Sequence, residues 1–155
     1  MDRVSLQERY APEGRCFGCG PANDRGLRIQ SFEAGDGTVV PEWQARPEHE
    51  AFGGYVNGGI LGTLIDCHSN WTAIAGFLAR DGDAAAPSTV TSEMSIRYRR
   101  PTPSGEPLRL IGRVVEIGDD RATVETEVRS GDQVTATGRA TFVKVPPAHP
   151  AFGRW

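Results

Sequence analysis

Residues 55–79, YVNGGILGTLIDCHSNWTAIAGFLA, form the only long apolar run of the chain that lacks a proline. Asn57 is a favoured N-cap residue, and the run ends where the polar, turn-rich residues from Arg80 onward begin. The sequence therefore predicts one long buried helix over about residues 57–79. Roughly 20 residues at about 1.5 Å each span about 30 Å, the width of a small domain.

The two faces of this helix differ in composition. Large apolar residues recur at helical spacing, and we expect the stripe that they form to pack on a sheet: Ile60, Leu64, Cys67, Trp71, Ile74 and Leu78, widened by Leu61, Ile65 and Ala75. Small and polar residues occupy another face, where we expect a close neighbour: Gly59, Gly62, Thr63, Asp66, Ser69, Asn70 and Ala73. Asp66 lies about two turns inside the helix, beyond the reach of the favourable helix dipole. Because a buried carboxylate is costly unless it is hydrogen-bonded, Asp66 is a candidate site residue; the alternative is a solvent-facing position on an exposed edge of the helix.

The flanking segments predict strands. Residues 27–34 and 38–45 are expected to form a hairpin around the turn at 35–37, the second strand lying at a sheet edge because of Pro41. After the helix, alternating residues predict strands over 90–98, 106–117, 121–129 and 134–145, and we interpret 46–54 as a loop. One long central helix, about 57–79, with an antiparallel sheet of about six strands wrapped around it is an α+β fold.

The domain limits follow from composition. A charged lead-in, 1–15, is expected to be loosely held, with a short helical turn near 5–10, and the domain is expected to span 16–145. The proline-rich tail, 146–155, is expected to be coil, within which Phe152 and Trp155 are candidates for packing.

Composition excludes several classes of partner. The net charge of −3 leaves no basic surface for nucleic acid, and the long apolar run contains Asp66, His68 and Asn70, which argues against a membrane span. The first ten residues lack the apolar core of a signal peptide, and the three cysteines cannot all pair within one chain. We expect a cytoplasmic protein.

Cys16 and Cys19 have the spacing of half a zinc site. A structural zinc site needs four ligands, and Cys67, His68 and His49 are poorly spaced along the chain to complete one. A glycine-rich turn with two small apolar anchors is the alternative that we favour, so we expect no metal and no cofactor.

Three segments together resemble the hotdog-fold acyl-CoA thioesterases, in particular the phenylacetate-degradation type. They are CFGCGPANDRGL from Cys16, VNGGILGTLID from Val56, and TSEMSIRYRRPTP from Thr91. The resemblance covers about residues 16–145 and implies a hotdog fold. It also implies that the backbone N–H of Gly58 polarises the thioester carbonyl and that Asp66 activates water or attacks directly. Asn57 stands where the family motif usually has histidine, and Gly59 follows as its second glycine.

The two implied groups are too far apart to act together in one chain. Gly58 and Asp66 are eight residues apart in the sequence, which along a straight helix separates them by about 12 Å. The acid must therefore come from a second copy across a two-fold axis, as the resemblance also implies. We expect a homodimer, with a dimer of dimers as the larger alternative.

Several further positions allow both a functional and a purely structural interpretation. Thr91 aligns with a hydroxyl that holds the attacking water in related enzymes, or is a routine strand threonine. Arg99 and Arg100, like Arg97, either meet the phosphates of coenzyme A or lie on a solvated strand face. Ala51 occupies a position that is often asparagine in the family; the nearby His49 either replaces that group or is an exposed loop histidine.

The function that the resemblance implies is hydrolysis of acyl-CoA or acyl-carrier-protein thioesters, without a cofactor. The alternative is a hotdog module that binds or senses acyl-CoA without catalysis, because Asn57 and Ala51 depart from the family pattern. A cysteine hydrolase built on Cys67 and His68 is disfavoured, because adjacent helical residues point about 100° apart.

Overall fold

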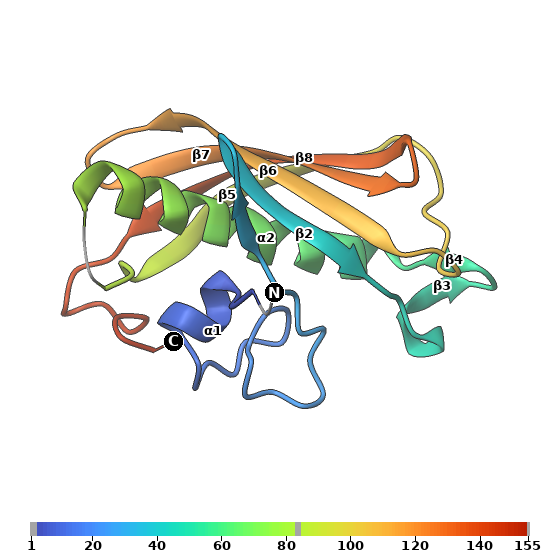
Figure 1. Ribbon diagram of the computed structural model, residues 1–155, viewed down its shortest axis with the longest axis horizontal. Coiled ribbons are helices and arrows are strands. Elements are labelled where there is room, and N and C mark those ends of the chain that lie inside the picture. Colours follow the sequence, from blue (N-terminus) through green and yellow to red (C-terminus); the bar gives the residue numbers. More distant parts are fainter. Residues whose placement is uncertain (1–2, 83–84, 155) are drawn as a thin grey trace.

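A computed structural model of the chain, which describes residues 3–82 and 85–154, has an α+β hotdog fold (Figure 1). One antiparallel sheet of six strands, in the order β1-β2-β6-β7-β8-β5, curves around the long helix α2, Gly58–Asp81. The strands are β1 Phe32–Ala34, β2 Gly37–Trp43, β5 Thr89–Tyr98, β6 Leu108–Ile117, β7 Arg121–Ser130 and β8 Gln133–Lys144. A short hairpin, β3 Glu50–Phe52 and β4 Tyr55–Val56, leads into α2.

The predicted central helix is confirmed, and its ends have clear causes. The side chain of Asn57 caps the N-terminus by accepting from the N–H groups of Gly59 and Ile60, at 2.7 and 3.2 Å. At the other end Gly82 adopts the left-handed conformation, φ 67°, and its N–H closes the last turn on the Leu78 carbonyl. This conformation is inexpensive only for glycine, so the helix runs two residues past its expected end, Ala79, and stops.

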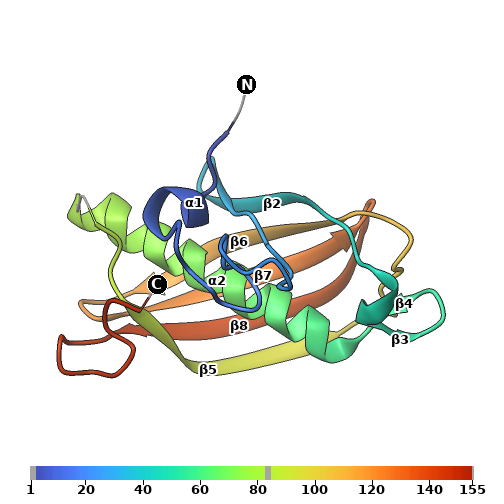
Figure 2. The same cartoon turned by 90° about the horizontal axis from the view of Figure 1, so that it is seen from below.

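The predicted packing side of α2 is partly wrong. Ile65, at the edge of the predicted stripe, does meet the sheet at Gly138. The same face also includes Ser69 and Phe77 from outside the stripe, and the Ser69 hydroxyl bonds the Thr126 hydroxyl of β7 at 2.8 Å. Cys67 and Trp71, from the predicted sheet-facing stripe, are covered instead by the N-terminal segment. Figures 1 and 2 show α2 lying between the sheet and this N-terminal segment. A helix that is covered on both sides needs apolar residues around most of its circumference, which is what the long run supplies.

The N-terminal lead-in is packed, not loosely held as predicted. Helix α1, Leu6–Tyr10, begins with a capping box between Ser5 and Glu8. Gln7 is buried and its side chain bonds the N–H and hydroxyl of Ser31. These bonds attach the lead-in to Ser31, which lies in the N-terminal segment that covers α2.

The first predicted hairpin is shorter than expected. Only residues 32–34 pair with β2, because residues 27–31 turn away from the sheet and bury Leu27 and Ile29 in the core shared with α1 and α2. Pro41 lies where the β2–β6 register shifts, and β1 pairs only with 37–39. Only the second half of β2 therefore lies at a sheet edge, as predicted for the strand that contains Pro41. The expected loop over 46–54 contains a 3-10 turn, Pro47–His49, and strand β3.

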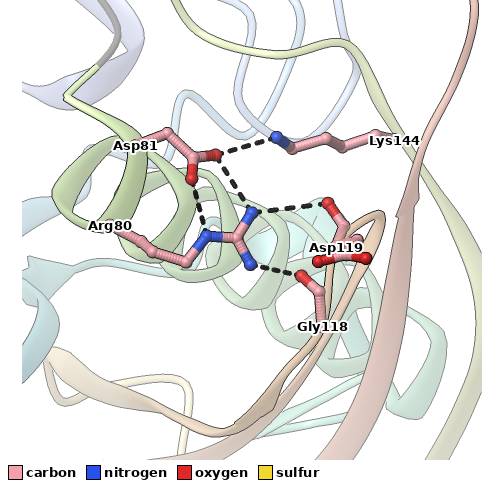
Figure 3. Close-up of polar contacts among 5 residues, drawn as sticks. All are labelled: Arg80, Asp81, Gly118, Asp119 and Lys144. Atoms are coloured by element: carbon pink, nitrogen blue, oxygen red, sulfur yellow. Dashed lines mark hydrogen bonds and ion pairs between the residues drawn. The ribbon is translucent and has the colours of Figure 1, made fainter.

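A polar cluster fastens the C-terminal end of α2 to the sheet (Figure 3). The Arg80 guanidinium donates to the Asp81 carboxylate at 2.6 and 3.0 Å and to the carbonyls of Gly118 and Asp119 in the β6–β7 turn. Lys144, at the end of β8, donates to the same carboxylate at 3.0 Å. Arg80 thus joins the helix end to the turn, and Asp81 joins it to the end of β8.

The tail turns back against the domain. The Gly153 N–H donates to the Ser88 hydroxyl at 2.9 Å, and Phe152 stays largely exposed. Trp155, the other predicted packing residue, lies outside the described residues. In the described part of the chain, every helix is too short or too polar to cross a bilayer.

Candidate active site

Asp66 and Thr91 meet where α2 passes the edge strand β5. The Thr91 hydroxyl donates to Asp66 Oδ1 at 2.7 Å. The helix places the half-buried carboxylate beside the strand, and the strand alternation directs Thr91 toward it. Thr91 therefore contacts the candidate acid, while its role in holding a water molecule stays a prediction.

A pocket of about 420 Å³ opens around this pair. Four parts of the chain line it: the N-terminal loop through Arg15, Cys16 and Cys19; α2 through Asp66, Cys67 and Asn70; β5 through Thr89, Val90 and Thr91; and the tail through Ala151 and Arg154. The Thr89 hydroxyl donates to the Asn70 side-chain oxygen at 2.6 Å, so a second polar pair between helix and strand lies beside the first.

Burial raises the pKa of the Asp66 carboxyl above its ordinary value. The hydrogen bond from Thr91 opposes this rise, and the nearby Cys16 adds to it. A carboxylate that is partly desolvated and held by one donor keeps its other oxygen for a further partner. Such a group can accept a proton from water or attack an electrophilic carbon.

The N-terminus of α2 offers a second chemical group. Asn57 satisfies the N–H groups of Gly59 and Ile60, and the Leu61 N–H bonds the Asn57 carbonyl at 3.1 Å. Within residues 3–82 and 85–154, no acceptor is found for the Gly58 N–H. A helix N-terminal N–H without a partner is a suitable donor to a developing oxyanion.

Tyr98 shields one side of this N-terminus. Its hydroxyl donates to the Gly58 carbonyl at 2.8 Å, and a Cβ on Gly58 would lie 3.5 Å from its ring. Asn57, in place of the family's histidine, uses its side-chain oxygen for capping. The helix start is therefore well ordered without the histidine, while the assigned roles of Asn57, Gly58 and Gly59 stay predictions.

Gly58 and Asp66 lie on the same continuous helix, α2. At about 1.5 Å per residue they are about 12 Å apart along its axis. One carbonyl cannot contact both groups of one chain, which agrees with the expectation from the sequence.

The two predicted arginines lie away from the Asp66 pocket of their own chain. The backbone N–H groups of Arg99 and Arg100 both bond the Thr135 carbonyl, and the Arg100 guanidinium donates to the Gln133 side chain at 2.9 Å. Arg99 lines a separate pocket of about 520 Å³ with Arg97, Glu125 and residues of β6–β8. Both arginines are exposed, and their contact with coenzyme A stays a prediction.

His49 is buried, so the alternative of an exposed loop histidine is wrong. Its ring stacks on Trp43 at 5.4 Å, and its Nδ1 accepts the Arg46 N–H at 3.0 Å. Its carbonyl accepts the Asn57 N–H at 2.8 Å. Burial lowers the pKa of this imidazole, and the nearby Arg46 lowers it further. These contacts place His49 behind the helix cap; Ala51 is exposed in β3.

Sequence reasoning judged Cys67 poorly spaced to join Cys16 and Cys19, and so missed that the three cysteines meet. Cys67 comes from the helix to meet Cys16 and Cys19, and the three sulfurs lie within 4.8 Å of one another. Asn70 was also missed, although its position four residues after Asp66 puts both on one helical face. The sequence pattern gave less indication of the cysteine cluster, because Cys16 and Cys19 reach α2 only through the fold of the N-terminal loop.

Several solved structures have folds similar to that of this chain, and the first described here is a thioesterase superfamily protein. One from Shewanella loihica is 31% identical, with 81% of this chain and 98% of that chain covered and a TM-score of 0.64. The PaaI protein of the E. coli phenylacetic acid degradation operon is 17% identical, with 77% and 81% covered and a TM-score of 0.63. A Streptococcus mutans protein bound to acetyl-CoA is 21% identical, with 76% and 88% covered and a TM-score of 0.62.

No curated protein matches the chain. The family model of the thioesterase superfamily matches residues 53–137, a stretch that contains Gly58, Asp66 and Thr91. It covers more than half of the chain, and the Shewanella loihica structure supports the same assignment over most of the remainder. The chain belongs to the thioesterase superfamily.

Proposed function

We propose that this protein hydrolyses acyl thioesters of coenzyme A, or of acyl carrier protein, to a free acid and a thiol. The observation that carries the proposal is the Asp66 carboxylate, held by Thr91 at 2.7 Å in a pocket between α2 and β5. Membership of the thioesterase superfamily supports the reaction class. The acetyl-CoA in the Streptococcus mutans structure supports coenzyme A as the thiol part of the substrate.

In the proposed reaction, Asp66 takes a proton from water as the water oxygen attacks the thioester carbon. The carbonyl oxygen gains negative charge and accepts a hydrogen bond from the Gly58 N–H. The tetrahedral intermediate then expels the thiolate. The proton held by Asp66 protonates the leaving sulfur. Direct attack by the carboxylate is the alternative route, in which water hydrolyses an acyl-enzyme anhydride. Both routes use only water and groups of the chain.

The proposed site combines two chains, Gly58 from one and Asp66 from its partner. Strand β5 supports this arrangement because it is the last strand of the sheet and ten residues long, with one edge unpaired in the described chain. Met94 and Tyr98 are large and exposed on this strand. A long exposed edge with apolar side chains favours pairing with a second copy.

The decisive experiment measures thiol release from short-chain, long-chain and aromatic acyl-CoA substrates, with the wild type and Asp66→Asn compared. The amide cannot accept a proton or attack, so we expect kcat/KM to fall by at least about a hundredfold. Circular dichroism and sedimentation establish that both proteins are folded and equally associated.

Activity that survives in Asp66→Asn would assign the base to another residue. If neither protein released thiol, titration calorimetry with the same acyl-CoA compounds would decide the alternative. Binding without turnover would identify a sensing module, and absence of binding would exclude both functions. In a single turnover in heavy-oxygen water, release of unlabelled acid would identify direct attack followed by hydrolysis at the Asp66 carbon, because an Asp66 oxygen then stays with the acyl group.

A further inference from the structure

Three cysteine sulfurs meet at the wall of the Asp66 pocket. Cys16 and Cys19 come from the N-terminal loop, Cys67 comes from α2, and their sulfur atoms all lie within 4.8 Å of one another. Cys19 and Cys67 are buried, whereas Cys16 is half-buried. The proposed hydrolysis uses none of these thiols, so the cluster requires a separate explanation.

The spacing of one sulfur pair fits metal coordination. Cys16 Sγ lies 3.7 Å from Cys67 Sγ, and all three cysteines are free. A disulfide would bring two sulfurs to about 2.05 Å. A tetrahedral zinc ion with Zn–S bonds of about 2.3 Å holds its sulfurs about 3.8 Å apart. The Cys16–Cys67 pair thus already has the separation that such an ion requires.

The surroundings of the sulfurs include a hydrogen-bond donor. The Trp71 indole N–H donates to Cys19 Sγ at 3.4 Å. Gly18 packs so closely on α2 that a Cβ there would overlap Cys67 Sγ. Donors of this kind stabilise a thiolate and fix its direction, as the partners of metal ligands do.

We propose that Cys16, Cys19 and Cys67 bind a Zn²⁺ ion through three thiolates, with the fourth position open to the pocket and filled by water. Three protein ligands with one open position are the arrangement of an accessible zinc site. As the Zn–S bonds form, the three thiols release their protons to solvent. The anionic complex that results shares the pocket with Arg15 and Arg154, whose charges oppose its own.

The test uses the full chain, reduced with a phosphine and stripped of metal. Cobalt(II) is titrated as a spectroscopic probe, and zinc then displaces it. We expect about one metal per chain, with the sulfur-to-cobalt charge-transfer absorption of a tetrahedral thiolate site. Zinc should also raise the midpoint of thermal unfolding, because it binds the folded chain.

Cys16→Ser is the informative variant, since the half-buried Cys16 is the most accessible of the three residues. Loss of a partner beyond the ligands already weakens metal binding by about 10- to 100-fold, so loss of this ligand should weaken it by at least about a hundredfold. Asp66→Asn is the matched control in the same pocket, and it should keep the charge-transfer absorption while hydrolysis is lost. This pair separates failure of the metal site from failure of the proposed function.

Absence of the charge-transfer absorption in fully reduced wild type would overturn the proposal. Equal metal affinity of the wild type and Cys16→Ser would overturn it as well. Thermal unfolding of metal-free Cys16→Ser shows whether the variant is folded. If it is not folded, Cys67→Ala in its place should abolish binding in a folded, metal-free protein, and retained binding there would exclude the site.

Discussion

Gly58 has its proposed role through its backbone N–H, which makes it testable by an unusual substitution. Proline is favoured at the first position of a helix and removes the N–H. The preceding Asn57 has φ −60° and ψ 137°, the extended conformation that a residue before proline prefers. Gly58→Pro should therefore fold normally and lower kcat by about 10²- to 10³-fold, the usual effect of losing one oxyanion donor.

The matched control is Gly58→Ala, which keeps the N–H and brings a Cβ only to ordinary contact distance, 3.5 Å, from the Tyr98 ring. Thiol release from acyl-CoA and circular dichroism of the three proteins give the comparison. Equal losses in the alanine and proline variants would show that the space around Gly58 matters and its N–H does not.

At the level of single residues, the sequence supplied part of the candidate site. Asp66 stood out because an acid inside an apolar helix needs an explanation, and its contact with Thr91 follows from the packing of α2 beside β5. The cysteine cluster could not be derived in this way. Its formation depends on how the loop that carries Cys16 and Cys19 folds over α2, and no periodicity encodes that contact.

Among the elements, α2 and the sheet approach closely because glycine faces the helix. A Cβ on Gly138 of β8 would overlap Cγ2 of Ile65, a β-branched side chain with little rotamer freedom in a helix. Gly138→Ala should lower the free energy of unfolding by about 1–3 kcal/mol, the usual cost of overpacking. Gly105→Ala is the control, because nothing lies within 4 Å of its added Cβ. Urea unfolding measures both, and equal stability of the two variants would refute the close-contact argument.

The cluster at the end of α2 predicts a dependence on pH (Figure 3). Hydrogen bonds from Arg80 and then Lys144 hold the pKa of Asp81 well below its ordinary value of 3.8. Because the folded state has the lower pKa, this stabilisation is fully present above the unfolded value and is lost as pH falls below about 3.8. The stability difference between wild type and Asp81→Asn should thus shrink as pH falls.

Urea unfolding at a series of pH values measures this difference. Asp132→Asn, in the exposed turn between β7 and β8, is the control and should show little difference at any pH. High salt should reduce the effect of Asp81, since exposed ion pairs are screened. A difference that stayed constant down to pH 3 would show that the Asp81 charge does not stabilise the fold.

Secondary structure was more predictable than packing. The cap at Asn57 and the alternation after the helix were enough to locate α2 and the strands β5–β8. The side of α2 that meets the sheet was not predictable, because apolar residues lie around most of its circumference and two layers compete to cover it. For the same reason, the apolar residues of 27–31 were assigned to a strand, although they cover the helix.

For the whole molecule, the decisive question is whether one catalytic site uses two chains. Gly58 and Asp66 lie about 12 Å apart along one helix axis, and within the described residues one edge of β5 has no strand beside it. If Gly58 of one chain serves Asp66 of its partner, a dimer of one Gly58→Pro chain and one Asp66→Asn chain contains one intact site and one doubly defective site.

Such a mixed dimer, purified through two different tags, should recover about half of the wild-type kcat per dimer, although each parent homodimer is nearly inactive. Sites built within single chains would predict the opposite result, because every site of the mixed dimer would then carry one defect. The wild-type chain with both tags controls for the purification, and sedimentation equilibrium establishes that each species is a dimer. Recovery of activity requires that the two groups come from different chains, since neither variant chain contains both.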